Sequence, residues 1–205
     1  MKKTNATLLL TLAAFGATFG ATVQQSASST PRIAVALAGG GALGYAHIGV
    51  LQAFDEAGIK PVYIAGTSMG AIVGVLYAQG FSGNELYDFV VQKRLYTAYR
   101  NVSTTWRHMN RGIGTHKNVV KLFREAIPHN SFDSLAIPFV CVATHIRTGQ
   151  PVARHSGGDL HSWVLASASI PVIFQPMLID GEYYCDGGLT DNLPAQYIPR
   201  PTISV

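Results

Sequence analysis

The stretch Val62-Tyr63-Ile64-Ala65-Gly66-Thr67-Ser68-Met69-Gly70-Ala71 decides the fold of this 205-residue chain. A short apolar run ends at Gly66, and an apolar segment of helical length follows over 71–79. The pentapeptide between them fits the pattern Gly-x-Ser-x-Gly, which exposes a serine on a sharp turn between a strand and a helix. We therefore expect a strand over 62–65, a helix over 71–79 and a candidate nucleophile at Ser68, with Gly66 and Gly70 letting neighbouring backbone pass close. The alternative is a serine that only caps the helix.

The residues before this stretch show the same order of elements. Residues 32–37 form an apolar run that is typical of a buried strand. Gly39 to Gly41 end this run, and apolar residues then recur at helical spacing over 42–57. Two successive strand–loop–helix units indicate a parallel sheet with helices packed on it. The sequence therefore predicts an α/β fold.

The rest of the chain carries further strand, turn and helix signals. Residues 84–127 look largely helical, with one break at 112–114. We predict a hairpin of strands 138–144 and 150–155 around Thr148-Gly149, and a helix over 158–168. A second hairpin is predicted from strands 177–179 and 182–185 around Asp180-Gly181, a strong turn signal, and a last strand over 203–205.

The N-terminal segment differs from the rest. Lys2 and Lys3 precede an apolar stretch over 8–21, and the polar segment 24–30 follows. This order is typical of a secretory signal peptide, and a bilayer span needs about 20 apolar residues. We predict that residues 1–28 are a signal peptide and polar linker and that 29–205 form one exported domain, periplasmic or secreted. An uncleaved anchor or a buried helix remains the alternative, and membrane association is left open.

Composition excludes several classes of protein. With 48% hydrophobic and 13% charged residues, the chain is not a disordered polyelectrolyte. The net charge of +4 is mild, so no nucleic-acid partner is expected. Two cysteines cannot build a disulfide scaffold, and no His or Cys spacing matches a metal site, so we expect no metal or other cofactor. Export would place Cys141 and Cys185 in an oxidising compartment, and the sequence leaves open whether they pair.

A glycine-rich loop, Gly39-Gly40-Gly41-Ala42-Leu43-Gly44, follows the first predicted strand. It matches the dinucleotide-binding pattern Gly-x-Gly-x-x-Gly, but that use requires an Asp or Glu about 20 residues later, at the end of the next strand. The next strand ends in Gly66 instead. The same loop can direct backbone N–H groups at an oxyanion. We favour an oxyanion hole formed by Gly39, Gly40, Gly41 and Gly44, and nucleotide binding stays the rival interpretation.

The proton acceptor for Ser68 has to be sought among the acids. In an α/β-hydrolase triad the acid follows the serine and a histidine comes last. Here the last histidine is His161, and the acids that follow it are Asp180, Asp186 and Asp191. Asp186-Gly187-Gly188 follows an apolar strand, and its glycines permit a tight turn that holds the carboxylate toward a neighbouring loop. An ordinary Asp-Gly turn is the plain alternative.

Three motifs in this order, at 39–44, 66–70 and 186–188, together resemble the patatin-like phospholipase family. The similarity continues through 42–51, 166–171 and 191–194 and covers roughly residues 32–196. It implies a three-layer α/β/α sandwich with a mainly parallel central sheet. It also implies calcium-independent hydrolysis of phospholipid or other acyl-ester substrates by a Ser–Asp dyad, without a catalytic histidine. Carried over by position, Ser68 is the nucleophile and Asp186 the base.

Two positions depart from the family pattern. Leu43 stands where the family usually has Arg or Lys, and His145 replaces the Asp of an Ala-Thr-Asp segment. The missing cation at Leu43 keeps open a second hypothesis, a catalytically weak relative that binds lipid or protein.

A basic stretch lies between Asp88 and Glu125, where the chain has no acid. Aromatic side chains are interleaved with its cations, so it could contact an anionic membrane surface. A solvated helical face is the alternative. The stretch holds eight of the 15 basic residues: Lys93, Arg94, Arg100, Arg107, Arg111, Lys117, Lys121 and Arg124.

Overall fold

The computed structural model describes residues 33–90, 117–198 and 202–204. The leader predicted over 1–28 and the helix break predicted at 112–114 lie outside the described residues. So do the basic residues from Lys93 to Arg111. The predictions made for these segments therefore stay predictions.

Every element predicted within the described residues is present, with small shifts at its ends. The strands are β1 (Ala34–Leu37), β2 (Tyr63–Thr67), β3 (Phe139–His145), β4 (Gln150–Arg154), β5 (Met177–Ile179), β6 (Glu182–Asp186) and β7 (Thr202–Ser204). The α-helices are α2 (Ala46–Glu56), α3 (Met69–Gln79), α4 (Gly83–Val90), α6 (Lys117–Ala126) and α7 (Leu160–Ser167). Short 3₁₀ turns are η1 (Gly41–Tyr45), η3 (Phe132–Ser134), η4 (Gly187–Leu189) and η5 (Ala195–Tyr197). The helix predicted over 42–57 thus begins as the 3₁₀ turn η1.

The described strands form one mixed sheet with the order β5-β6-β3-β2-β1-β7, and β4 pairs with β3. The pairs β1–β2, β1–β7 and β2–β3 are parallel. The pairs β3–β4, β3–β6 and β5–β6 are antiparallel. The α/β prediction is confirmed. The sheet, expected to be mainly parallel, is mixed because both predicted hairpins join it.

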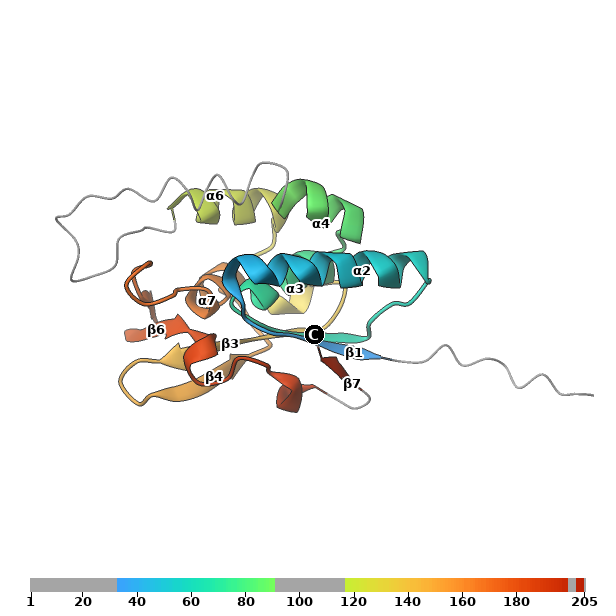
Figure 1. Ribbon diagram of the computed structural model, residues 1–205. Helices are drawn as coiled ribbons and strands as arrows, with labels where there is room; N and C mark the ends of the chain where they lie inside the picture. The colour runs from blue at the N-terminus through green and yellow to red at the C-terminus, as the bar shows by residue number, and fades with distance from the viewer. Residues whose placement is uncertain (1–32, 91–116, 199–201, 205) are drawn as a thin grey trace, which may run out of the picture. The chain divides into compact units, whose positions relative to one another are not determined.

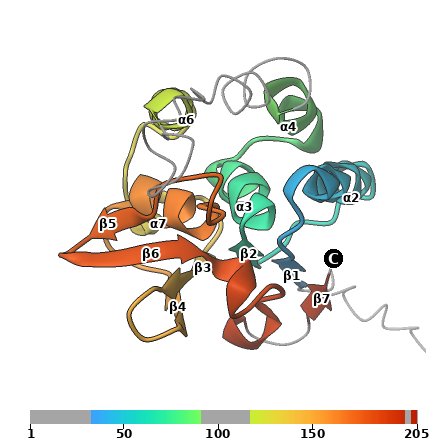
Figure 2. The same ribbon diagram turned by 60° about the vertical axis from the view of Figure 1, so that its left-hand side comes forward.

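The α-helices of the described part lie on one side of the sheet, with α2, α3 and α7 next to it and α4 and α6 further out (Figures 1 and 2). Helix α3 is buried from Met69 to Ala78, as expected of a helix that is apolar on all sides. On the other side of the sheet, Ala34, Ala65 and Val140 pack against Ile198, next to η5. None of the described helices is both long and apolar enough to span a bilayer.

Strand β3 brings the ends of β2 and β6 together. Residues 141–142 of β3 pair with both β2 and β4, and residues 143–145 pair with both β4 and β6. Strands β2 and β6 therefore occupy the same edge of β3. Thr67 and Asp186, their last residues, lie opposite neighbouring residues of β3. Because β6 runs antiparallel to β2, the two strands run toward each other, and Ser68 follows directly where they meet.

The two cysteines are separate buried thiols. Cys141 lies in β3 and Cys185 in β6, and both are free. The disulfide that the sequence left open is not formed.

Candidate active site

Ser68 lies on a strained turn between β2 and α3. Its backbone has φ 53° and ψ −120°, a conformation that residues other than glycine rarely adopt. A Cβ on Gly70 would overlap the carbonyl oxygen of Leu37, and one on Gly66 would lie 2.5 Å from the carbonyl oxygen of Gly70. The two glycines of the motif are therefore required because backbone passes directly against them, as the spacing predicts.

The hydroxyl of Ser68 donates a hydrogen bond to Asp186. The distance from Oγ to Oδ2 is 2.6 Å, and the side chains are 118 residues apart in sequence. Both residues are nearly buried, with 5% and 6% of their surface exposed. The backbone N–H of Ser68 donates to Oγ of Ser167, at 3.0 Å. The serine is thus fixed through its hydroxyl and its backbone.

Asp186 is held through its backbone and both carboxylate oxygens. Its N–H donates to the carbonyl oxygen of Ser169 at 3.0 Å, and its carbonyl oxygen accepts from Oγ1 of Thr144 at 2.8 Å. Oδ1 accepts from the N–H of Gly188 at 2.8 Å, which leaves Oδ2 directed at Ser68. The tight turn predicted at 186–188 therefore orients the carboxylate toward the serine.

Burial raises the pKa of Asp186 above its usual value, although hydrogen bonds from Ser68 and from Gly188 act in the opposite direction. A carboxylate with a raised pKa holds a proton more strongly than a solvated one, so it is a better proton acceptor. The carboxylate that faces Ser68 is therefore more basic than a solvated one.

The buried histidines of the described part have partners away from the dyad. Nε2 of His47 lies 2.8 Å from the carbonyl oxygen of Ala38, and Nε2 of His161 lies 2.9 Å from that of Ile127. His145 contacts Thr148 and Glu182. Burial lowers the pKa of His161. Within the described residues, the acceptor for the Ser68 hydroxyl is therefore a carboxylate.

The glycine loop at 39–44 lies beside Ser68, but its four predicted glycines are not equivalent. The N–H of Gly39 donates to the carbonyl oxygen of Asn192 at 3.0 Å, so this amide is already in use. Gly44 packs against α3, where an added Cβ would come within 2.5 Å of the Met69 side chain. Gly40 and Gly41 line the cleft beside Ser68 and are the stronger oxyanion candidates of the four.

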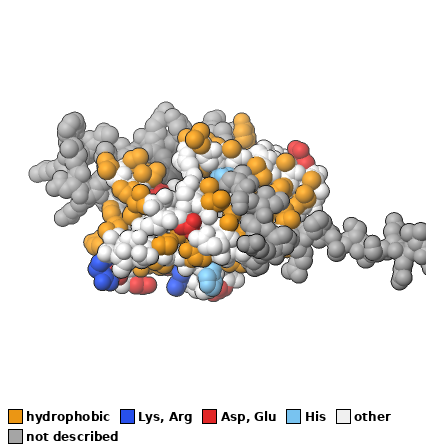
Figure 3. All heavy atoms as spheres, turned by 60° about the horizontal axis from the view of Figure 1, so that its bottom comes forward, with side chains coloured by type: hydrophobic (Ala, Val, Ile, Leu, Met, Phe, Trp, Pro, Cys, Tyr) orange, Lys and Arg blue, Asp and Glu red, His pale blue; other side chains and the backbone are white. Residues whose placement is uncertain are grey.

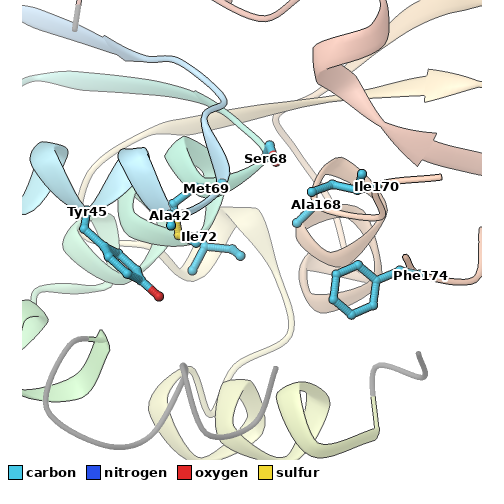
Figure 4. Close-up of a pocket in the computed structure, with 9 residues that line it drawn as sticks. Ala42, Tyr45, Ser68, Met69, Ile72, Ala168, Ile170 and Phe174 are labelled. Carbon is cyan, nitrogen blue, oxygen red and sulfur yellow. The ribbon is translucent and has the colours of Figure 1, made fainter. Parts of the chain in front are cut away.

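Ser68 lines two pockets. In the apolar one, Ala42, Tyr45, Met69 and Ile72 face Ala168, Ile170 and Phe174, with Ser68 at one end (Figure 4). The other is more polar and includes the dyad and the glycine loop. It is lined by Gly39, Gly40, Gly41, Ser68, Ile170, Pro171, Asp186, Gly188, Leu189 and Asn192. The two pockets share Gly41, Ser68 and Ile170, so they adjoin at the serine; we call them the apolar arm and the polar arm of the cleft. No group of three or more His, Cys, Asp or Glu side chains in the described part could hold a metal ion.

Comparison with known proteins identifies the family of this chain. A family model described as patatin-like phospholipase matches residues 35–198. The chain belongs to that family. It is 38% identical over 176 residues to uncharacterized NTE family proteins of Mycobacterium tuberculosis and Mycobacterium bovis, covering 82% of this chain and 45% of theirs. It is 32% identical over 181 residues to the lysophospholipase nte1 of Aspergillus fumigatus, covering 81% of this chain and 11% of that protein.

Among solved structures, this patatin-like chain is similar to VipD from Legionella pneumophila. The TM-score is 0.63 at 14% identity, and the match covers 86% of this chain and 49% of VipD. At that identity the match shows the fold alone. The patatin-like chain spans less than half the length of the relatives named here.

The two departures from the patatin-like pattern lie away from the reacting atoms. Leu43 is 85% exposed in η1 and lines neither arm of the cleft. His145, at the end of β3, contacts Glu182 at 3.2 Å rather than the dyad. In the described structure neither side chain hydrogen-bonds to Ser68 or Asp186.

Sequence reasoning gave no role to three residues that brace the patatin-like site. Ser167 accepts from Ser68, and the backbone of Ser169 holds Asp186. Nδ2 of Asn192 donates to the carbonyl oxygen of Gly39 at 3.2 Å, which fastens the glycine loop. The only signal for them was their place in the segments 166–171 and 191–194 that carry the family resemblance.

Proposed function

We propose that this patatin-like chain is a serine-dependent lipid acyl hydrolase of the phospholipase A or lipase type, with Ser68 as nucleophile and Asp186 as base. The observation that carries the proposal is the 2.6 Å hydrogen bond from Oγ of Ser68 to Oδ2 of Asp186, made at a strained elbow. Relatives named lysophospholipase support an ester of a phospholipid as the substrate class.

In this mechanism, Asp186 takes the hydroxyl proton while Oγ of Ser68 attacks the ester carbonyl carbon. Negative charge develops on the carbonyl oxygen of the ester. The backbone amides of the glycine loop and the N-terminus of α3 lie beside this oxygen, and both stabilise negative charge. As the intermediate collapses, the ester C–O bond breaks and Asp186 returns the proton to the leaving alcohol. A water then attacks the acyl carbon and loses a proton to Asp186. The bond from the acyl carbon to Oγ of Ser68 breaks, Asp186 returns the proton to Oγ, and the fatty acid is released.

The two arms of the cleft suit the two halves of such a substrate. The apolar arm, with Tyr45, Ile72 and Phe174, fits an acyl chain. The polar arm lies beside the dyad, so the alcohol or head group of the bound substrate would lie near Gly188 and Asn192. Export of the mature chain belongs to the same proposal and rests on the leader pattern alone.

Labelling with a fluorophosphonate probe tests the proposal. The probe is expected to attach to Ser68, located by mass spectrometry, because only a serine activated by a neighbouring base reacts readily. The variant Ser68→Ala is the control and should take up no label. Labelling of a different serine, or no labelling of the folded protein, would contradict the assignment.

A further inference from the structure

Exposed hydrophobic side chains gather around the mouth of the cleft. The described part has ten large hydrophobic side chains that are exposed, and five of them belong to the three segments that line the cleft, 41–45, 170–174 and 187–193. We call these five residues the apolar rim: Leu43, Val172, Ile173, Leu189 and Leu193. Apolar side chains grouped at a functional opening mark an interaction site more strongly than the same side chains scattered singly.

The rim has little charge of its own. Its three segments contain no Lys or Arg, and their one acid is Asp191. Leu43 itself occupies the position where the family resemblance led us to expect a cation. Figure 3 shows hydrophobic side chains over much of the described surface on one face, with Lys and Arg near its lower edge. The rim therefore suits an uncharged or zwitterionic partner better than an anionic one.

One rim side chain, Val172, is exposed on strained backbone. Val172 has φ 73°, which is unfavourable for a β-branched residue, and it is 73% exposed. The N–H groups of Ile173 and Phe174 both donate to the carbonyl oxygen of Ile170, which closes a tight turn with Val172 at its tip. A strained, solvent-exposed valine beside the cleft gains no packing in the described structure that would explain it.

From these observations we propose that the apolar rim docks the chain on a lipid surface, with the cleft facing that surface, and that docking does not require anionic lipid. The proposal rests on the proposed function only for the choice of a lipid as partner. Lipid ester substrates are held in such surfaces, and rim and cleft share the same three segments. This mode differs from contact through the basic stretch over 93–124, which would need negative lipid charge.

Vesicle binding by the full chain carrying Ser68→Ala tests the proposal, because this protein binds lipid without consuming it. The rim variant is Leu43→Asn with Val172→Asn, since neither residue lines the cleft and asparagine tolerates a positive φ. The control is Val62→Asn with Leu178→Asn, two side chains that are 37% and 57% exposed and lie outside the three segments.

We expect the parent and the control to bind phosphatidylcholine vesicles equally, with little change between low and high salt. The rim variant should bind at least about tenfold more weakly while keeping its fold and melting temperature. Equal binding by the rim variant, binding that needs anionic lipid and disappears in high salt, or no vesicle binding by the parent would each overturn the proposal. Hydrolysis of a soluble ester by the chain with Ser68 intact is measured in parallel, so loss of the proposed function is told apart from loss of docking.

Discussion

The two halves of the dyad are built in different ways. The serine half is largely local, because β2, the elbow and the start of α3 follow one another over residues 63–70. The aspartate half is assembled from distant segments, with Thr144 of β3, Ser169 beyond α7 and Ser68 itself all holding Asp186. A nucleophile elbow can therefore be recognised from a few consecutive residues, whereas the base depends on how the strands pair.

The largest effect is expected from the local half. Ser68→Ala removes the attacking oxygen and should lower turnover of a soluble ester by at least about a thousandfold. The fold should persist, because alanine keeps the backbone contact to Ser167. Steady-state hydrolysis and thermal unfolding measure the two effects, and turnover near that of the parent would remove Ser68 from the mechanism.

Glycine substitutions probe whether the two halves depend equally on close backbone packing. Gly70→Ala would press against the carbonyl of Leu37, and Gly187→Ala against that of Val142. Backbone cannot easily yield, so each should lower the free energy of unfolding by about 2–3 kcal/mol.

The matched control for both is Gly49→Ala in α2, where an added Cβ meets nothing within 4 Å. It should stabilise the chain by up to about 1 kcal/mol, as expected for alanine in a helix. Urea unfolding compares the three variants. If Gly187→Ala behaved like Gly49→Ala, the packing of the aspartate half against β3 would be wrong.

Ser167 connects the end of α7 to the elbow, so it tests a distant contact of the serine half. Ser167→Ala leaves the buried N–H of Ser68 without this acceptor, a loss of about 1–3 kcal/mol. We expect turnover to fall about tenfold, because the elbow is less firmly held. Ser134→Ala, whose exposed hydroxyl contacts Ser131, is the control and should change nothing. Parental turnover by Ser167→Ala would show that the elbow is positioned without α7.

The pH dependence of stability tests the aspartate half by itself, because Asp186 is the member of the dyad that titrates. Burial raises the pKa of Asp186, so the folded protein keeps this proton in a pH range where the unfolded chain has released it. The stability that the protonated Asp186 contributes is fully present below the pKa that Asp186 has in the unfolded chain. It is lost as the pH rises through the higher pKa that Asp186 has in the folded protein. Asp186→Asn cannot ionise and escapes that loss, so its stability relative to the parent should increase from acid pH toward neutral pH. Urea unfolding at several pH values measures this, and a difference that is constant with pH would contradict it.

The same contrast explains how much the sequence could predict. Glycines, short apolar runs and the turn at Asp180-Gly181 act locally, so the elements and both hairpins were predictable from residues. Strands β2 and β6 meet on one edge of β3 through tertiary pairing, which no short stretch of sequence predicts. Asp186 was preferred over an ordinary Asp-Gly turn only because of the family resemblance. Gly39, Ser167 and Asn192 support the site through hydrogen bonds to residues more than 90 positions away in the sequence. The spacing of residues within a motif therefore could not predict their roles.

The central claim is that Asp186 takes the proton of Ser68 directly. The most direct measurement is the rate at which a fluorophosphonate labels Ser68 in the parent, in Asp186→Asn and in Asp191→Asn. Asp186→Asn keeps the size of the side chain and removes the acceptor, so labelling should slow by about a thousandfold, whereas Asp191→Asn should label nearly as fast as the parent. If Asp186→Asn labelled at the parental rate, the base would lie elsewhere and the Ser–Asp dyad would be wrong.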